Sequence, residues 1–125
     1  MNFIYKDVNI LSPTESDSLY DEAAIIASLS NLLSTRKGEL PFNSDYGVTL
    51  EDHLFDIIDD VTSLEIFREI TESISIYEPR IILDLARTIV TPDVDRGEYT
   101  LTIVGRIRGM KDQLFEFEGN LTKAD

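Results

Sequence analysis

The spacing of hydrophobic residues changes along the chain from a helical period to a two-residue alternation, and the change falls close to Pro79. In the first part, apolar side chains recur every three or four positions between residues 19 and 34. An α-helix has about 3.6 residues per turn, so this spacing places them on one face. The pattern predicts an amphipathic helix over residues 19–34 with Ser18 as its N-cap, and its face comprises Leu19, Ala23, Ile25, Ile26, Leu29, Ser30, Leu32 and Leu33.

Two further helices are predicted before the change of period. A short one covers residues 49–57 and is capped by Thr49. A longer one opens at the capping box Thr62-Ser63-Leu64-Glu65 and runs to Tyr77, because Pro79 lacks a backbone N–H and disfavours helical geometry in the residue before it. The buried residues expected on this helix are Leu64, Phe67, Ile70, Ile74 and Tyr77, and those expected to face water are Arg68, Glu69 and Glu72.

After Pro79 the apolar residues alternate with polar ones, which is typical of half-buried strands. Strands are predicted over residues 81–91, 98–108 and 113–119. The second strand carries its apolar face on Tyr99, Leu101, Ile103 and Ile107, and the third on Phe115 and Phe117. Short connections favour antiparallel neighbours. The predicted fold class is therefore α+β, with two to three N-terminal helices packed on a C-terminal three-stranded antiparallel meander.

Composition and charge limit the classes of partner. The formal net charge is −13, from 11 basic and 24 acidic side chains, and a nucleic-acid binder needs an excess of Lys and Arg instead. No apolar stretch approaches the roughly 20 residues that span a bilayer, and the start has no secretory pattern, so neither nucleic acid nor membrane is expected as a partner. A chain of 125 residues predicts one folded unit. Its expected parts are an extended N-terminal arm over residues 1–17, a single α+β domain over 18–121 and a short tail over 122–125.

The loop after the first helix carries aromatic residues that a purely polar connection does not need. Arg36 and Lys37 complement the helix C-terminus, and Gly38 is a left-handed stop. Phe42 and Tyr46 follow, and we expect them either to pin the loop to the body or to face a partner.

No polar residue belongs to a recognisable catalytic or metal-binding motif. His53 is the sole histidine and the chain has no cysteine, so His53 is expected to be a surface or boundary residue. Residues 93–97 fail as a calcium loop, because the glycine comes one place early and Val104 stands where a bidentate acid is required. Glu78 has the most distinctive setting among the carboxylates, but the charge of Arg80 pairs with a carboxylate rather than with the protonated acid of a glycosidase. We predict no catalytic residue, no metal site and no cofactor.

Several short motifs taken together are more specific than any one of them. They are Thr35-Arg36-Lys37-Gly38-Glu39 with Pro41-Phe42, then Tyr46-Gly47, Leu54-Phe55 and Tyr77-Glu78-Pro79-Arg80-Ile81. In this order and spacing they resemble the small baseplate wedge protein of contractile-tailed bacteriophages, a family shared with type VI secretion systems and related injection particles. The resemblance covers about residues 19–108.

The resemblance implies a structural, non-enzymatic subunit of a virion tail baseplate, assembled in the host cytoplasm as part of a hetero-oligomer. The implied partners are the core bundle of the large baseplate wedge proteins, the tail sheath protein by strand addition, and central hub proteins. Glu78, Pro79 and Arg80 would contact the wedge bundle. A signature loop, either contact or scaffold, matches at Arg36, Gly38, Glu39, Pro41 and Phe42.

Alternatives remain open at this point. The unpaired backbone groups on the edge strands of a meander either accept a partner strand or are covered by the arm or tail. The family has been labelled lysozyme-like, so a peptidoglycan-degrading muramidase is the rival function, although no residue here supports it. A type VI secretion baseplate component and an unrelated acidic adaptor are further possibilities.

Overall fold

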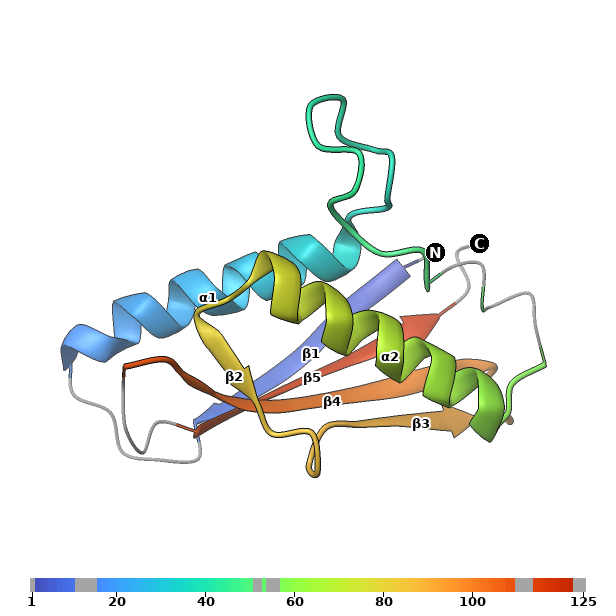
Figure 1. Ribbon diagram of the computed structural model, residues 1–125. Helices are drawn as coiled ribbons and strands as arrows, with labels where there is room; N and C mark the ends of the chain where they lie inside the picture. The colour runs from blue at the N-terminus through green and yellow to red at the C-terminus, as the bar shows by residue number, and fades with distance from the viewer. Residues whose placement is uncertain (1, 11–15, 51–52, 54–56, 110–113, 123–125) are drawn as a thin grey trace.

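The protein has an antiparallel sheet with two helices packed on one face, as the computed structural model shows in Figure 1. The structure describes residues 2–10, 16–50, 53, 57–109 and 114–122, and side chains from residue 23 onwards. In chain order the elements are β1 (Asn2–Ile10), α1 (Ser16–Ser34), α2 (Asp60–Tyr77), β2 (Ile81–Leu83), β3 (Ile89–Asp93), β4 (Glu98–Ile107) and β5 (Leu114–Thr122).

The sheet is wider than the predicted meander. Its strand order is β1-β5-β4-β2, and β3 also pairs with β4. β2 pairs with one end of β4, with Ile81 opposite Ile107, whereas β3 pairs with the other end, with Asp93 opposite Glu98. The α+β class is thus confirmed, with two helices in the described chain. The expected three strands are corrected to five, of which β2 and β3 share one edge.

The N-terminal segment expected to be an arm forms strand β1 over residues 2–10. It pairs antiparallel with β5, and the register shifts between Tyr5 and Asp7. A bulge of this kind inserts one extra residue into one strand of an antiparallel pair. With it, Phe3 is opposite Leu121 and Val8 is opposite Phe117, both of which are buried. The segment therefore covers the edge of β5, which was one of the two alternatives for the sheet edges.

The predicted strand over residues 81–91 is wrong, because a turn at Asp84 divides it into β2 and β3. The Asp84 N–H donates to the Val104 carbonyl, and the Asp84 carboxylate accepts from the Ala86 N–H. The Asp84 carbonyl accepts from both the N–H and the hydroxyl of Thr88. Aspartate commonly stabilises such turns through its own side chain. The alternation on either side of the turn concealed this break.

Both long helices begin earlier than predicted. α1 begins at Ser16, so Ser18 lies inside the helix. α2 begins at Asp60 with Asp59 as its N-cap, whose carboxylate accepts from the Thr62 N–H, so the predicted capping box is wrong. The end of α2 at Tyr77 is confirmed. Of the helix predicted over residues 49–57, part lies outside the described residues, and no α-helix is present in the described part.

The core lies between the helices and the sheet. Leu64 was expected in it but is half-exposed, and Ala23 is also exposed, whereas Ile66 is fully buried. The predicted apolar faces of the second and third strands are confirmed. The largest fully buried side chains are Tyr99, Phe117, Ile25, Leu29, Leu32, Leu33, Leu50, Ile66, Ile70, Ile74, Leu101 and Ile103. Among the described residues, neither helix has the length and apolar character needed to cross a membrane.

Candidate functional site

The turn that joins α2 to β2 is held by backbone hydrogen bonds on both sides. The Glu78 N–H donates to the Ile74 carbonyl at 2.8 Å and so ends α2, and the Ile81 N–H donates to the Glu78 carbonyl at 3.2 Å. Arg108, at the end of β4, donates its N–H to the Arg80 carbonyl at 2.7 Å and its Nε–H to the Pro79 carbonyl at 3.2 Å. The turn is therefore fixed to the sheet, and its geometry does not depend on a partner.

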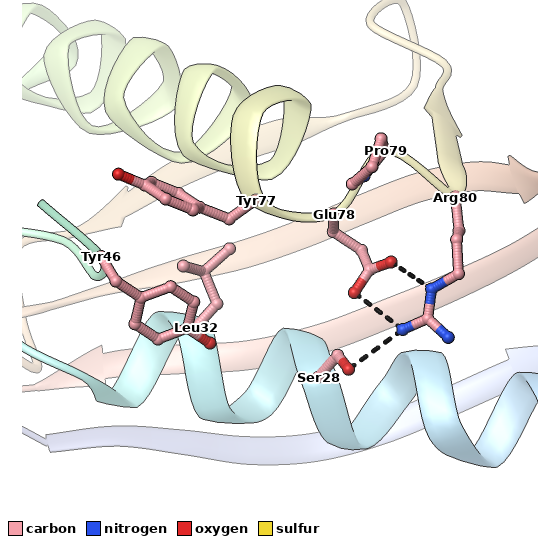
Figure 2. A pocket seen from close by; sticks show the side chains of 7 residues that line it. All are labelled: Ser28, Leu32, Tyr46, Tyr77, Glu78, Pro79 and Arg80. Atoms are coloured by element: carbon pink, nitrogen blue, oxygen red, sulfur yellow. Dashed lines mark hydrogen bonds and ion pairs between the residues drawn. The ribbon is translucent and has the colours of Figure 1, made fainter. Parts of the chain in front are cut away.

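Within the turn, Glu78 and Arg80 form a bidentate ion pair, drawn in Figure 2. Arg80 donates from Nε to Glu78 Oε1 at 2.6 Å and from Nη2 to Glu78 Oε2 at 3.0 Å. Arg80 Nη2 also lies 3.2 Å from Ser28 Oγ on α1. The Glu78 side chain is only 6% exposed, whereas that of Arg80 is 52% exposed. Such a fork fixes the plane of the guanidinium, so Glu78 positions Arg80 at the surface.

Beside this ion pair lies a pocket of about 450 Å³. Two of its lining residues, Tyr46 and Tyr77, meet edge to face, with ring centroids 5.2 Å apart and an interplanar angle of 74°. Asn31 Nδ2 lies 3.3 Å from the Tyr46 hydroxyl, which ties the ring to α1. The residues lining the pocket are Ser28, Leu32, Tyr46, Tyr77, Glu78, Pro79 and Arg80, all labelled in Figure 2.

The loop over residues 35–48 projects from the end of α1, away from the sheet (Figure 1). Hydrogen bonds close its neck: the Val48 N–H donates to the Thr35 carbonyl at 2.9 Å, and the Lys37 N–H donates to the Val48 carbonyl at 3.2 Å. Further along, the Gly38 N–H donates to the Ser44 carbonyl at 2.8 Å. The loop is therefore an internally bonded unit.

Two signature residues serve this internal structure. Gly38 has a φ of 87°, which a residue with a side chain rarely adopts, so the predicted left-handed conformation is confirmed. The Glu39 carboxylate accepts from the Arg36 N–H at 2.9 Å, and the Glu39 N–H donates to the Arg36 carbonyl at 3.0 Å. Gly47, with a φ of 114°, packs so closely that a Cβ there would collide with the Thr35 carbonyl oxygen.

At the tip of the loop the side chains are exposed. Pro41 is exposed, Leu40 is 41% exposed, and Phe42 is 102% exposed. Of the two roles expected for the aromatic residues of the loop, fixing it to the body or facing outward, each residue therefore has one. Tyr46 fixes the loop to the body through Tyr77, and Phe42 has its whole ring in solvent.

The structure brings only part of the sequence-predicted site together. Glu78, Pro79 and Arg80 form one corner with the pocket beside it. The five signature-loop residues, Arg36, Gly38, Glu39, Pro41 and Phe42, do not line that pocket. Tyr46 connects the two, because it belongs to the loop and lines the pocket. Sequence reasoning missed Ser28, since no local pattern indicates that α1 passes beside Arg80.

A second polar cluster was also missed. Glu69 on α2 was expected to face water but is largely buried, and it accepts hydrogen bonds from the N–H and the hydroxyl of Thr49. His53 Nε2 lies 3.1 Å from Glu69 Oε2, and His53 Nδ1 lies 3.4 Å from Glu65 Oε2. Burial opposes ionisation of Glu69, but the hydrogen bonds from Thr49 and His53 outweigh it and hold the pKa of Glu69 below its ordinary value. This cluster fixes the segment that follows the loop, at Thr49 and His53, to α2.

No group of three or more His, Cys, Asp or Glu side chains suited to a metal ion occurs in the described part of the chain. The Asp93 side chain, which began the calcium-like segment, accepts instead from the Arg96 N–H at 3.2 Å. These contacts are internal to the β3–β4 turn.

Among the comparisons with known proteins, a family model and a curated relative carry the same description. The family model described as baseplate wedge protein gp25 matches residues 20–112. Baseplate wedge protein gp25 of Enterobacteria phage T4 is 37% identical over 76 residues, which cover 61% of this chain and 54% of that protein, so the match spans about half of the relative's length. A solved structure of a putative tail lysozyme from Geobacter sulfurreducens superposes with a TM-score of 0.73 at 25% identity, covering 84% of this chain and 93% of that one.

Proposed function

Since the chain belongs to the baseplate wedge protein gp25 family, we propose that it is a structural subunit of a phage tail baseplate, located in the virion after assembly in the host cytoplasm. Its partners are the other proteins of the baseplate, in a hetero-oligomeric assembly. A phage tail is preferred over a type VI secretion baseplate because the curated relative comes from phage T4.

The observation that carries this proposal is the corner formed by Glu78, Pro79 and Arg80. Arg80 presents a guanidinium whose orientation is set by a buried carboxylate, and Pro79 is exposed beside it. Arginine is enriched among the residues that dominate binding energy at interfaces, and a pre-oriented side chain loses less conformational entropy on binding. The docking surface for the core bundle of the large wedge proteins is thus Pro79 with Arg80, and Glu78 acts through Arg80.

The sheet supports a second contact, with the tail sheath protein. Strand addition needs an edge whose backbone N–H and C=O groups are unpaired. Because β1 covers β5, the outer edges of the described sheet are those of β1 and of the β2–β3 side. A sheath segment that pairs along one of these edges gains backbone hydrogen bonds without a particular side-chain pattern. Central hub proteins are a further neighbour in such an assembly.

Replacing Arg80 tests the docking corner. Arg80→Ala is expected to leave the isolated fold largely intact, because the backbone of the turn stays bonded to Arg108, although the melting temperature should fall because the buried Glu78 carboxylate loses its cation. Co-purification with the large wedge proteins should be lost at temperatures where the variant is still folded, because the oriented cation is gone. The matched control is Arg87→Ala, which removes an arginine of similar exposure that pairs with Asp84 elsewhere on the surface. Normal particles assembled from the Arg80→Ala protein would refute the proposed corner.

The alternative is a peptidoglycan-degrading muramidase, which the name of the structural neighbour favours. A muramidase needs a carboxylic acid that donates a proton to the leaving oxygen. In this protein both oxygens of Glu78 accept hydrogen bonds from Arg80, so Glu78 is a poor donor. A peptidoglycan-degradation assay on the pure protein decides between the two. Lysis that Glu78→Gln abolishes would replace the structural proposal, whereas absence of lysis is expected.

A further inference from the structure

We propose that Phe42 is a second docking contact, which inserts into an apolar socket on the same partner protein that binds the Glu78–Arg80 corner. The other signature residues, Arg36, Gly38 and Glu39, form the scaffold that holds Phe42 in position. This inference rests on the proposed function and deepens it, because it separates contact from scaffold within the signature loop.

The scaffold role follows from where the polar groups of the loop are directed. The Glu39 carboxylate and backbone bond to Arg36, and Gly38 bonds to Ser44 across the loop. These groups are occupied within the loop, and Gly38 has no side chain to offer a partner. What they achieve is a fixed path for the chain, with Phe42 at its outer end.

The contact role follows from exposure combined with this order. A phenyl ring that lies wholly in water stabilises nothing in the protein itself, and aromatic residues contribute most to affinity when a partner buries them. A loop that is already bonded along its length loses little conformational entropy on binding. Phe42 therefore has the properties of a preorganised anchor for a pocket.

Phe42 lies in the same loop as Tyr46, which lines the pocket beside the Glu78–Arg80 corner, so we assign both contacts to one partner protein. Tyr46 lines the pocket next to Glu78 and Arg80, and Phe42 precedes it by four residues in the same loop. Four residues of chain span at most about 14 Å, which is close to the width of one α-helix with its side chains, about 10–12 Å. Neighbouring helices of a bundle seated on the corner would thus reach Phe42. The net charge of −13 disfavours phosphate surfaces, which leaves a protein partner rather than nucleic acid or lipid headgroups.

The test is an affinity measurement between the full-length protein and the large wedge proteins, co-expressed or purified. Phe42→Ser is expected to weaken binding at least about tenfold with an unchanged melting temperature, because the ring is wholly exposed in the free protein. The matched control is Val94→Ser, which removes an apolar side chain of 71% exposure from the β3–β4 turn and should leave binding unchanged. Photo-crosslinking from benzoylphenylalanine at position 42 should label the large wedge protein.

The outcomes separate this inference from the proposed function. If Arg80→Ala weakens binding and Phe42→Ser does not, the anchor is wrong and the docking corner stands. A loss with Phe42→Ser but not with Arg80→Ala would keep the anchor and overturn the corner. If neither change weakens binding, both fall. A crosslink from position 42 to a different baseplate protein would overturn the assignment to a common partner.

Discussion

Glu69 should stabilise the protein through its charge, and this can be measured with Glu69→Gln. The carboxylate accepts from the N–H and hydroxyl of Thr49 and meets His53 Nε2 at 3.1 Å, in a largely buried setting. Hydrogen bonds to a charged group contribute about 1.5–3 kcal/mol each, and the Gln carbonyl can retain part of those from Thr49. We therefore expect Glu69→Gln to lower the free energy of unfolding by about 1–3 kcal/mol at pH 7, or the melting temperature by about 3–10 °C.

The pH dependence makes the test specific. The folded pKa of Glu69 lies below its ordinary value of 4.5, so its contribution is complete above that value and is lost as the pH falls through the folded pKa. Glutamine does not titrate. The gap in melting temperature between wild type and Glu69→Gln should therefore narrow as the pH is lowered below 4.5. Thermal unfolding followed by circular dichroism across pH 3–7 measures it.

The matched control is Glu72→Gln, one exposed carboxylate on the same helix. It should change the melting temperature little at any pH, since surface charges contribute about 0–1 kcal/mol. Equal stability of wild type and Glu69→Gln at pH 7, or a gap that persists unchanged in acid, would refute the argument that the ionised carboxylate anchors the loop.

Three further substitutions probe the loop and the start of α2. Gly47→Ala should destabilise the protein by at least about 2 kcal/mol, because φ is positive and the new Cβ would collide with the Thr35 carbonyl. Gly38→Ala should cost only about 1 kcal/mol, because φ is positive there too but no atom lies within 4 Å of the new Cβ. Chemical denaturation measures both free energies of unfolding, and equal decreases would contradict the collision at Gly47. Asp59→Ala should increase amide hydrogen exchange in the first turn of α2, because the cap to the Thr62 N–H is lost. Hydrogen bonds from Thr62 lower the pKa of Asp59 below 3.8, so the contribution of the cap to stability is present above pH 3.8 and disappears as the pH falls further. If Asp59→Ala leaves amide exchange at neutral pH unaltered, Asp59 does not cap the helix.

Signals that act within a few residues were correctly interpreted from the sequence. Pro79 fixes the end of α2 at Tyr77, because a missing N–H and a steric clash do not depend on the rest of the fold. The alternation in residues 98–107 placed Tyr99 and Leu101 on the buried face, and the motif order identified the family. Where two local signals competed, local reasoning failed. Both Asp59 and Thr62 suit an N-cap, and the helix starts at the earlier one.

Choices between equivalent local patterns were settled by packing. α2 carries two apolar stripes, one through Leu64 and one through Ile66, and only contact with the sheet and α1 decides that Ile66 is buried. The N-terminal strand joins the sheet through pairing with β5, more than a hundred residues away in the chain, and its bulge is visible only once that register exists. Glu69 became a buried anchor for the same reason, since Thr49 and His53 reach it from a distant segment.

By itself, the sequence determined the class of the fold, the end of α2 and the identity of the residues at the Glu78–Arg80 corner, because these follow from backbone sterics, periodicity and motif order. Only the tertiary structure decided how those residues are arranged. It buries Glu78 under Arg80, brings Ser28 and Tyr46 beside them, and leaves Phe42 in solvent. The physical reason is that exposure and ion-pair geometry depend on segments that meet only in the folded chain.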